Sequence, residues 1–177
     1  MAQGSPGVGL TAGDVLARVR GAAGESVLET HEHVGDATVV VGRAAAPAVF
    51  RALRDRPELA FNFLMDATAV DFLGRNPRFE VVYHLYSLTH NARLRVKIRV
   101  PEQDAWVHSL VELWKSANWM ERETWDMFGI RFVGHPDLRR ILLYEEFVGH
   151  PLRKDYPFDK RQPLTAERDP IQVGWKV

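Results

Sequence analysis

The sequence predicts an α+β domain in which helices pack on one face of a mixed, mostly antiparallel sheet, followed by an extended C-terminal tail. Between residues 79 and 100, apolar and polar residues alternate through two stretches joined by a turn near His90, which predicts a hairpin. Apolar residues at helical spacing lie on both sides of this hairpin. Beyond Gly129 neither the alternation of a strand nor the spacing of a helix is sustained, and half of the ten prolines lie there. The predicted boundaries are a disordered N-terminus at 1–9, a domain at 10–128 and a tail at 129–177.

The composition narrows the classes of function. The 177 residues are enough for one domain with its own core, and there is no cysteine to form a disulfide, a thiolate metal site or an iron–sulfur ligand. The 23 basic and 23 acidic residues balance, so no excess charge favours nucleic acid or an anionic membrane. The first 17 residues contain no Lys or Arg and no long apolar run, which does not fit a secretory signal. We expect a cytosolic chain, or one held at a membrane only through partners.

Local signals place the elements in order. Thr11 with Asp14 predicts the start of a first helix, and Pro47 suits the first turn of a second helix that Pro57 ends. Strands are predicted at 27–34, 37–41 and 59–73, and two more lie within residues 78–100 around a turn near His90-Asn91.

The second strand of the predicted hairpin has one apolar and one basic face. Leu94, Val96, Ile98 and Val100 alternate with Arg93, Arg95, Lys97 and Arg99. The apolar face is expected to meet the core and the basic face to meet water or a partner. A nucleic-acid grip is the weaker alternative, because the net charge is zero.

Two further helices are predicted after Pro101. Apolar residues between Trp106 and Trp114 have helical spacing. For the next helix, Trp119–Phe128, we expect Asn118 to cap the start in a capping box with Glu121, and Gly129 to end it.

The tail combines irregular pattern with many large apolar residues. Such a run is too long for a loop within a compact domain and too apolar for a solvated linker. We therefore expect a backbone without internal partners that lies on another protein. Two related segments stand out in it, Gly134-His135-Pro136-Asp137-Leu138-Arg139-Arg140 and Gly149-His150-Pro151-Leu152-Arg153-Lys154.

Candidate chemistry is limited. Glu121, Glu123 and Asp126 do not share one helical face, and the Glu-x-x-His spacing of a dinuclear metal helix is absent. Capping by Glu121 and an Arg122–Asp126 pair at i,i+4 explain the charges more simply. Trp125 fits partner contact and core burial equally well. A free-standing metal hydrolase using Glu123, Asp126, His135 and His150 stays open as an alternative. Catalytic, cofactor and metal residues are predicted to be absent, and the candidates for partner docking are Arg122, Trp125, Asp126, His135, Arg139, Arg140, His150, Arg153 and Lys154.

The motifs resemble one family. "ERETWDMFGIRFVGHPDLRRIL" followed by "GHPLRKDYP" is similar to the signature of the C subunit, or thirty-kilodalton subunit, of bacterial proton-pumping NADH:quinone oxidoreductase, respiratory complex I. The upstream "ELAFNFLMDATAVDF" and "RFEVVYHLYSLTHNARLRVKIRVP" extend the resemblance over about residues 50–160. A weaker form of the pattern occurs in subunits of membrane-bound hydrogenases, which is the second alternative.

The resemblance implies a two-layer α+β subunit of the peripheral arm with no redox centre of its own. NADH, flavin, iron–sulfur clusters and quinone would be bound by other subunits, and the partners would be those that carry the terminal iron–sulfur cluster and the quinone pocket. The implied location is the cytoplasmic face of the bacterial inner membrane. Within the chain, we expect Arg122 and Asp126 to tie their helix to the following segment, with Arg139 or Arg140 as further candidates.

Overall fold

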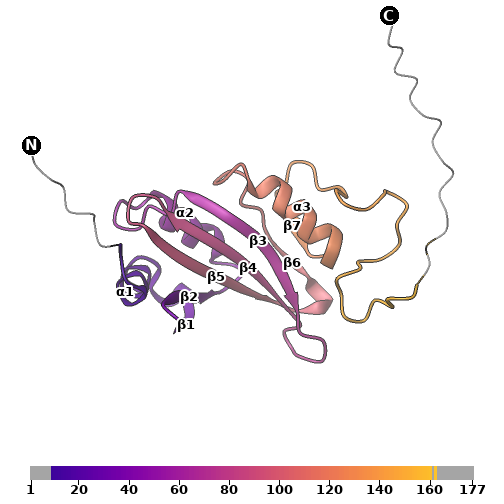
Figure 1. Cartoon of the computed structure of the whole chain (residues 1–177), viewed down its shortest axis with the longest axis horizontal. Helices are drawn as coiled ribbons and strands as arrows, with labels where there is room; N and C mark the ends of the chain where they lie inside the picture. The colour runs from indigo at the N-terminus through magenta and orange to yellow at the C-terminus, as the bar shows by residue number, and fades with distance from the viewer. Residues whose placement is uncertain (1–8, 161, 163–177) are drawn as a thin grey trace, which may run out of the picture.

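The computed structural model describes residues 9–160 and 162, and its centre is a five-stranded mixed sheet (Figure 1). The strand order is β1-β2-β5-β4-β3, in which β2 and β5 are parallel and the other neighbours antiparallel. The expected α+β fold is confirmed. The elements are α1 (Ala12–Ala23), β1 (Val27–His33), β2 (Asp36–Val41), α2 (Ala46–Asp55), β3 (Phe63–Asp71), β4 (Phe79–Ser87), β5 (Ala92–Val100), β6 (Trp106–His108), α3 (Ala117–Phe128) and β7 (Arg131–Val133), with short 3-10 turns at Gly24–Ser26 and Glu102–Asp104.

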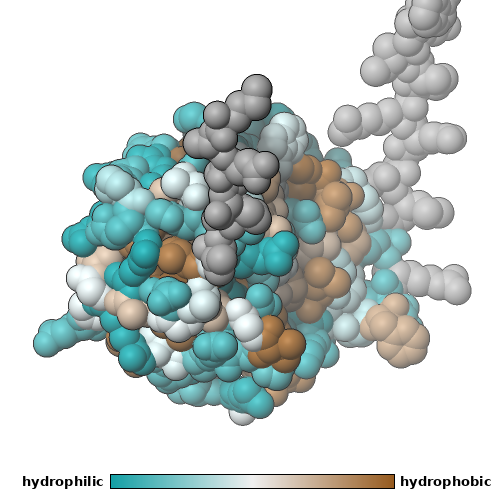
Figure 2. Space-filling model, turned by 60° about the vertical axis from the view of Figure 1, so that its left-hand side comes forward, coloured by the Kyte–Doolittle hydropathy of each residue, from teal (hydrophilic) through white to brown (hydrophobic). Residues whose placement is uncertain are grey.

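The core lies on the inward face of this sheet. The predicted alternation in β5 is confirmed, because Leu94, Val96, Ile98 and Val100 are all buried while Arg93 and Arg99 are exposed. Helices α1 and α2 contact each other and supply Val19 and Phe50 to the same apolar cluster. Helix α3 lies beside β3. On the outward face, three of the basic residues of β5 pair with acids, as in Lys97–Glu80 at 3.0 Å. Figure 2 shows the surface as apolar patches among polar residues.

Two helix boundaries follow their predicted signals. The Thr11 hydroxyl accepts from the Asp14 amide, and the Asp14 carboxylate accepts from the Thr11 amide, which is a complete capping box. Gly129 follows α3 with a φ of 75°, the left-handed conformation expected after a helix. Disorder was predicted at residues 1–9, of which residues 1–8 lie outside the described part of the chain.

The helix predicted between Trp106 and Trp114 is wrong. Residues 106–108 form β6, which pairs in parallel with β7, and turns around Leu110 follow. Val107, Leu110, Val111 and Trp114 are buried nonetheless. The spacing of the apolar residues correctly predicted which of them are buried. It could not predict the strand, because β6 pairs with residues that are distant in the sequence.

The capping box predicted at the start of α3 is also wrong. The helix begins earlier than expected, at Ala117, with Ser116 at the N-cap and no side-chain cap bond. Glu121 instead turns toward the segment after β6, where its carboxylate accepts from the Ser109 hydroxyl and the Leu110 amide, each at 2.6 Å. Glu121 therefore joins α3 to a neighbouring segment rather than closing its own first turn.

Candidate functional site: the junction of helix α3 and the strap

Helix α3 has buried polar side chains on more than one of its faces. Glu121, Arg122, Thr124 and Asp126 are all buried, which is unusual for charged residues unless each is paired. The Thr124 hydroxyl donates to the Ala67 carbonyl of β3 at 3.1 Å. Arg122 and Asp126 face residues 134–160, a segment that we call the strap. In Figure 1 the strap runs beside α3, on the side away from α1 and α2.

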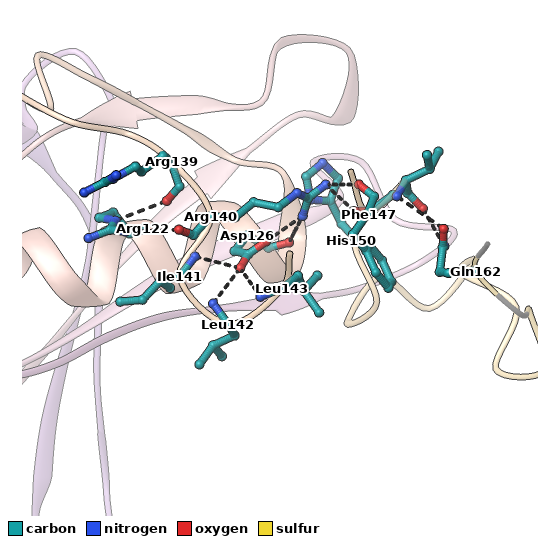
Figure 3. Close-up of polar contacts among 12 residues, drawn as sticks. Arg122, Asp126, Arg139, Arg140, Ile141, Leu142, Leu143, Phe147, His150 and Gln162 are labelled. Atoms are coloured by element: carbon teal, nitrogen blue, oxygen red, sulfur yellow. Dashed lines mark hydrogen bonds and ion pairs between the residues drawn. The ribbon is translucent and has the colours of Figure 1, made fainter. Parts of the chain in front are cut away.

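Asp126 is the main attachment point of the strap. Its carboxylate is fully buried and accepts from the Arg140 guanidinium at 2.5 Å. The Oδ2 atom also accepts from three successive amides, those of Ile141, Leu142 and Leu143, at 3.1, 2.9 and 3.0 Å (Figure 3). Burial by itself would raise the pKa of Asp126, but the amide of Leu143, the guanidinium and the other two amides together hold this pKa below its ordinary value. Asp126 is therefore a charged carboxylate with both of its oxygens engaged.

Arg122 attaches the strap through carbonyl groups. Its Nε donates to the Arg139 carbonyl at 3.1 Å and its Nη2 to the Arg140 carbonyl at 3.0 Å (Figure 3). The expectation that Arg122 and Asp126 tie α3 to the following segment is confirmed, with Arg140 as the side-chain partner. The predicted Arg122–Asp126 ion pair is wrong, because each of the two side chains is directed to the strap instead.

Arg139 and Arg140 have opposite environments although they are adjacent. The Arg140 side chain is 12% exposed and also donates to the carbonyls of Phe147 and Gly149, at 2.7 and 3.1 Å. The Arg139 side chain is 65% exposed and pairs only with nearby Asp137 among the described residues. Of the two, Arg140 is therefore the structural residue.

The second His-Pro segment closes the C-terminal end of α3. The last carbonyls of a helix have no intrahelical partners. Here His150 Nδ1 donates to the Asp126 carbonyl at 2.9 Å, the Leu152 amide to Met127 at 3.1 Å, and Arg153 Nε to Phe128 at 2.6 Å. The segment thus supplies one donor to each of three successive carbonyls.

The first His-Pro segment meets the other end of the helix. His135 Nε2 donates to the Asn118 carbonyl at 3.1 Å, while its Nδ1 accepts from the Asp137 amide at 3.0 Å. Both bonds together fix a neutral imidazole with its proton on Nε2. The histidines of the two related motifs therefore attach to opposite ends of one helix.

Gly129 is needed for the close approach of the second segment as well as for its φ. A Cβ atom there would lie 2.6 Å from the His150 ring and 2.7 Å from Arg153 Nη2. Trp125 is partly covered by the same segment, with its ring 6.4 Å from that of His150 and 5.7 Å from the Arg140 guanidinium. The strap of the same chain thus half-buries the Trp125 side chain. Contact of its exposed part with a partner stays a prediction.

The far end of the strap is held at a second cluster that the sequence did not reveal. Arg78 is buried and binds both carboxylate oxygens of Asp71 at 2.8 Å, both oxygens of Asp155 at 3.0 and 2.7 Å, and Glu102 at 2.5 Å. The Lys154 amide also donates to Asp71 at 2.8 Å. Arg78 lowers the pKa of both Asp71 and Asp155 through these bonds. No local motif marks this cluster, because Asp155 lies 77 residues beyond Arg78.

The expectation of a backbone without internal partners is wrong for residues 134–160. The contacts of Asp126, Arg122, Arg78 and the last turn of α3 hold this segment on its own domain. The part of the predicted tail beyond residue 162 lies outside the described residues. Docking of the tail on a partner stays a prediction.

The side chains considered for a metal site are not brought together. Glu123 is exposed, Asp126 is fully engaged, and His135 and His150 attach to opposite ends of α3. Within residues 9–160 and 162, no group of three or more His, Cys, Asp or Glu side chains is placed to hold a metal ion. No helix in the same part of the chain is long and apolar enough to cross a membrane.

The sequence and the fold are those of a known class of respiratory-chain protein. The family model described as "Respiratory-chain NADH dehydrogenase, 30 Kd subunit" matches residues 39–162, and the chain belongs to this family. The C subunit of NADH-quinone oxidoreductase from Roseiflexus sp. (strain RS-1) is 51% identical over 158 residues, covering 89% of this chain and 91% of that protein. The protein of the same name from Citrifermentans bemidjiense is 48% identical over 143 residues, covering 80% and 88%. The resemblance seen in the motifs is thereby confirmed.

Two solved structures share the fold. A trypsin-resistant fragment of Nqo5 has a TM-score of 0.61 and 35% identity, covering 70% of this chain and 96% of the fragment. A chain of the membrane-bound sulfane sulfur reductase, an archaeal respiratory membrane complex, has a TM-score of 0.69, covering 82% of this chain and 85% of its own length. The latter is 22% identical and shows the fold alone.

Proposed function

We propose that this chain is a non-redox structural and assembly subunit in the peripheral arm of an NADH:quinone oxidoreductase, where it supports electron transfer from NADH to quinone coupled to proton translocation. The observation that carries the proposal is the 51% identity to the Roseiflexus protein across 91% of that protein's length. The chemistry of the chain agrees, since the buried pairs Asp71–Arg78 and Asp126–Arg140 are engaged in holding its own strap and its sequence contains no cysteine to ligate a cluster.

The proposal extends to cofactors, partners and place. NADH, flavin, iron–sulfur clusters and quinone belong to other subunits, and the chain contacts those that carry the terminal cluster and the quinone pocket. It reaches the cytoplasmic face of the bacterial inner membrane only through these partners. A hydrogenase-type module remains the alternative, but the likeness to the archaeal complex is one of fold, whereas the sequence identity favours the quinone oxidoreductase.

Purification of the complex through a tag on this chain tests the proposal. Detergent-solubilised membranes should yield a multisubunit assembly that contains flavin and iron–sulfur clusters and oxidises NADH with quinone. The chain purified alone should be colourless and should not oxidise NADH. A stoichiometric flavin or cluster on the isolated chain, or co-purification with nickel-containing subunits in place of flavin-containing ones, would contradict the proposal.

A further inference from the structure

The strap directs many of its polar groups toward the domain and exposes several of its large apolar side chains. Its amides, carbonyls, Arg140 and His150 are directed inward to α3, as described above. Leu138 and Leu143 pack against the core, but Leu142 and Val148 are each 62% exposed. Leu152 and Tyr144 are exposed as well. Four large apolar side chains thus lie on the outer side of one short segment.

These apolar side chains are exposed because the strap is held on α3 in one conformation. The amides of Ile141, Leu142 and Leu143 are all bound to the Asp126 carboxylate, which sets the direction of the side chains that follow. Clusters of exposed apolar side chains on a segment held in one conformation are typical of surfaces that another protein covers. The strap therefore presents a preformed surface, and a partner would not have to order it first.

The charges on the same side indicate the chemistry of the occupant. Between Arg140 and Arg153 the charged residues are Glu145 and Glu146, both exposed, besides His150, which is held against α3. An anionic lipid surface would be repelled by this acidic pair, whereas a protein surface with Lys or Arg beside an apolar depression would complement it. Arg140 and Arg153 are not available for the same role, because both donate to the chain's own carbonyls, and the exposed bases Arg139 and Lys154 lie outside residues 142–152.

We propose that the outer side of residues 142–152 is an interface for another protein of the complex whose surface is apolar with a basic rim, with Leu142, Tyr144 and Val148 as the apolar contacts and Glu145 and Glu146 as the charged ones. This inference rests on the proposed function as a subunit of a larger complex. It adds apolar and acidic contacts to the predicted docking residues, among which Arg140 and Arg153 donate to the chain's own carbonyls while docking by Arg139 and Lys154 stays a prediction.

The test uses the full chain in a host strain that lacks its own copy of the protein. In the Leu142→Ser/Val148→Ser variant, the amount of assembled complex on native gels should fall at least tenfold, while the melting temperature of the isolated chain stays within about 2 °C because both side chains are exposed. The matched control is Leu28→Ser/Leu88→Ser, whose side chains are 61% and 66% exposed outside the strap. Its complex yield should equal that of the wild type.

A second variant keeps the test independent of apolar area. Glu145→Arg/Glu146→Arg reverses the charge without shortening an apolar side chain, and it should lower the complex yield at least fivefold. Wild-type yield with both strap variants would overturn the inference while leaving the proposed function intact. Self-association of the wild-type chain in sedimentation, or binding to phosphatidylglycerol vesicles, that is lost in Leu142→Ser/Val148→Ser would also overturn it, in favour of a second copy or a lipid surface. Absence of the wild-type chain from any complex would instead contradict the proposed function.

Discussion

Asp126 and Arg140 form a buried ion pair, with 2.5 Å between Oδ1 and Nη1, that joins α3 to the strap 14 residues further along the chain. Arg140→Ala would leave the Asp126 charge buried with only its backbone donors. Removal of one partner of such a pair costs about 3–5 kcal/mol. We expect trypsin to cleave the strap of the variant much faster than that of the wild type.

Arg139→Ala is the matched control for this prediction. Its side chain is exposed and pairs with an exposed aspartate, so a contribution of about 0–1 kcal/mol is expected. Complex yield on native gels should follow the same order, low for Arg140→Ala and near normal for Arg139→Ala. Equal protease resistance of the two variants would contradict a structural role for the Asp126–Arg140 pair.

Glu121 should make the protein less stable as the pH rises. Burial raises the pKa of this carboxyl to about 7, although the Ser109 hydroxyl and the Leu110 amide partly offset the effect. The folded state therefore binds a proton that the unfolded state releases between about pH 4.5 and 7, and the free energy of unfolding falls across this window by about 3 kcal/mol. Above pH 7 both states are deprotonated and the loss is complete.

Glu121→Gln isolates this contribution. The amide can accept from Leu110 and donate to Ser109, so the contacts survive without a titrating group. Urea unfolding of the wild type and the variant at pH 5, 6, 7 and 8 should give a difference that moves in favour of Gln as the pH rises. A constant difference over this range would show that Glu121 does not titrate there.

His150 should contribute a dependence of opposite sign. Its burial lowers its pKa, the neighbouring Arg153 and Arg140 guanidinium groups act in the same direction, and the Asp126 carbonyl and carboxylate oppose them. The neutral form is favoured in the folded state, so stability is lost as the pH falls below about 6.5, where the unfolded histidine takes up a proton. The strap should become more sensitive to protease between pH 7 and 5. His150→Asn retains a donor for the Asp126 carbonyl and should remove this change with pH.

Gly129→Ala tests the close packing of the strap on the end of α3. The variant combines the strain of a positive φ with a Cβ 2.6 Å from the His150 ring. Gly134→Ala has a comparable φ of 89° but meets nothing within 4 Å. The control should lose about 1 kcal/mol and Gly129→Ala clearly more. Equal losses in denaturant unfolding would mean that the packing of His150 adds nothing.

Sequence patterns were sufficient wherever one short segment contains the cause. The alternation in β5, the helix start at Thr11 and the glycine after α3 are local features, and all three were predicted. The pairing of β6 with β7 and the contact of Glu121 with Ser109 depend on segments that meet only in the folded chain. A single sequence carries no signal for such meetings.

The strap shows the same limit in another form. Its irregular pattern correctly predicted that residues 134–160 form no long helix or strand, and the two His-Pro segments were correctly singled out. Their role was not predicted. The sequence around a basic residue after proline is the same whether its side chain contacts a partner or a carbonyl of its own chain. Arg140 and Arg153 face their own chain.

Three consecutive carbonyls of α3 are satisfied by donors from residues 150–153. The last turn of the helix and the second His-Pro segment should consequently open and close as a single cooperative unit. In hydrogen exchange, the amides of Gly129 and Leu152 should share one opening free energy, although 23 positions separate them in the sequence. A change in the stability of the strap would therefore change the stability of the last turn of α3 as well, and binding of a partner to the strap would raise the opening free energy of both.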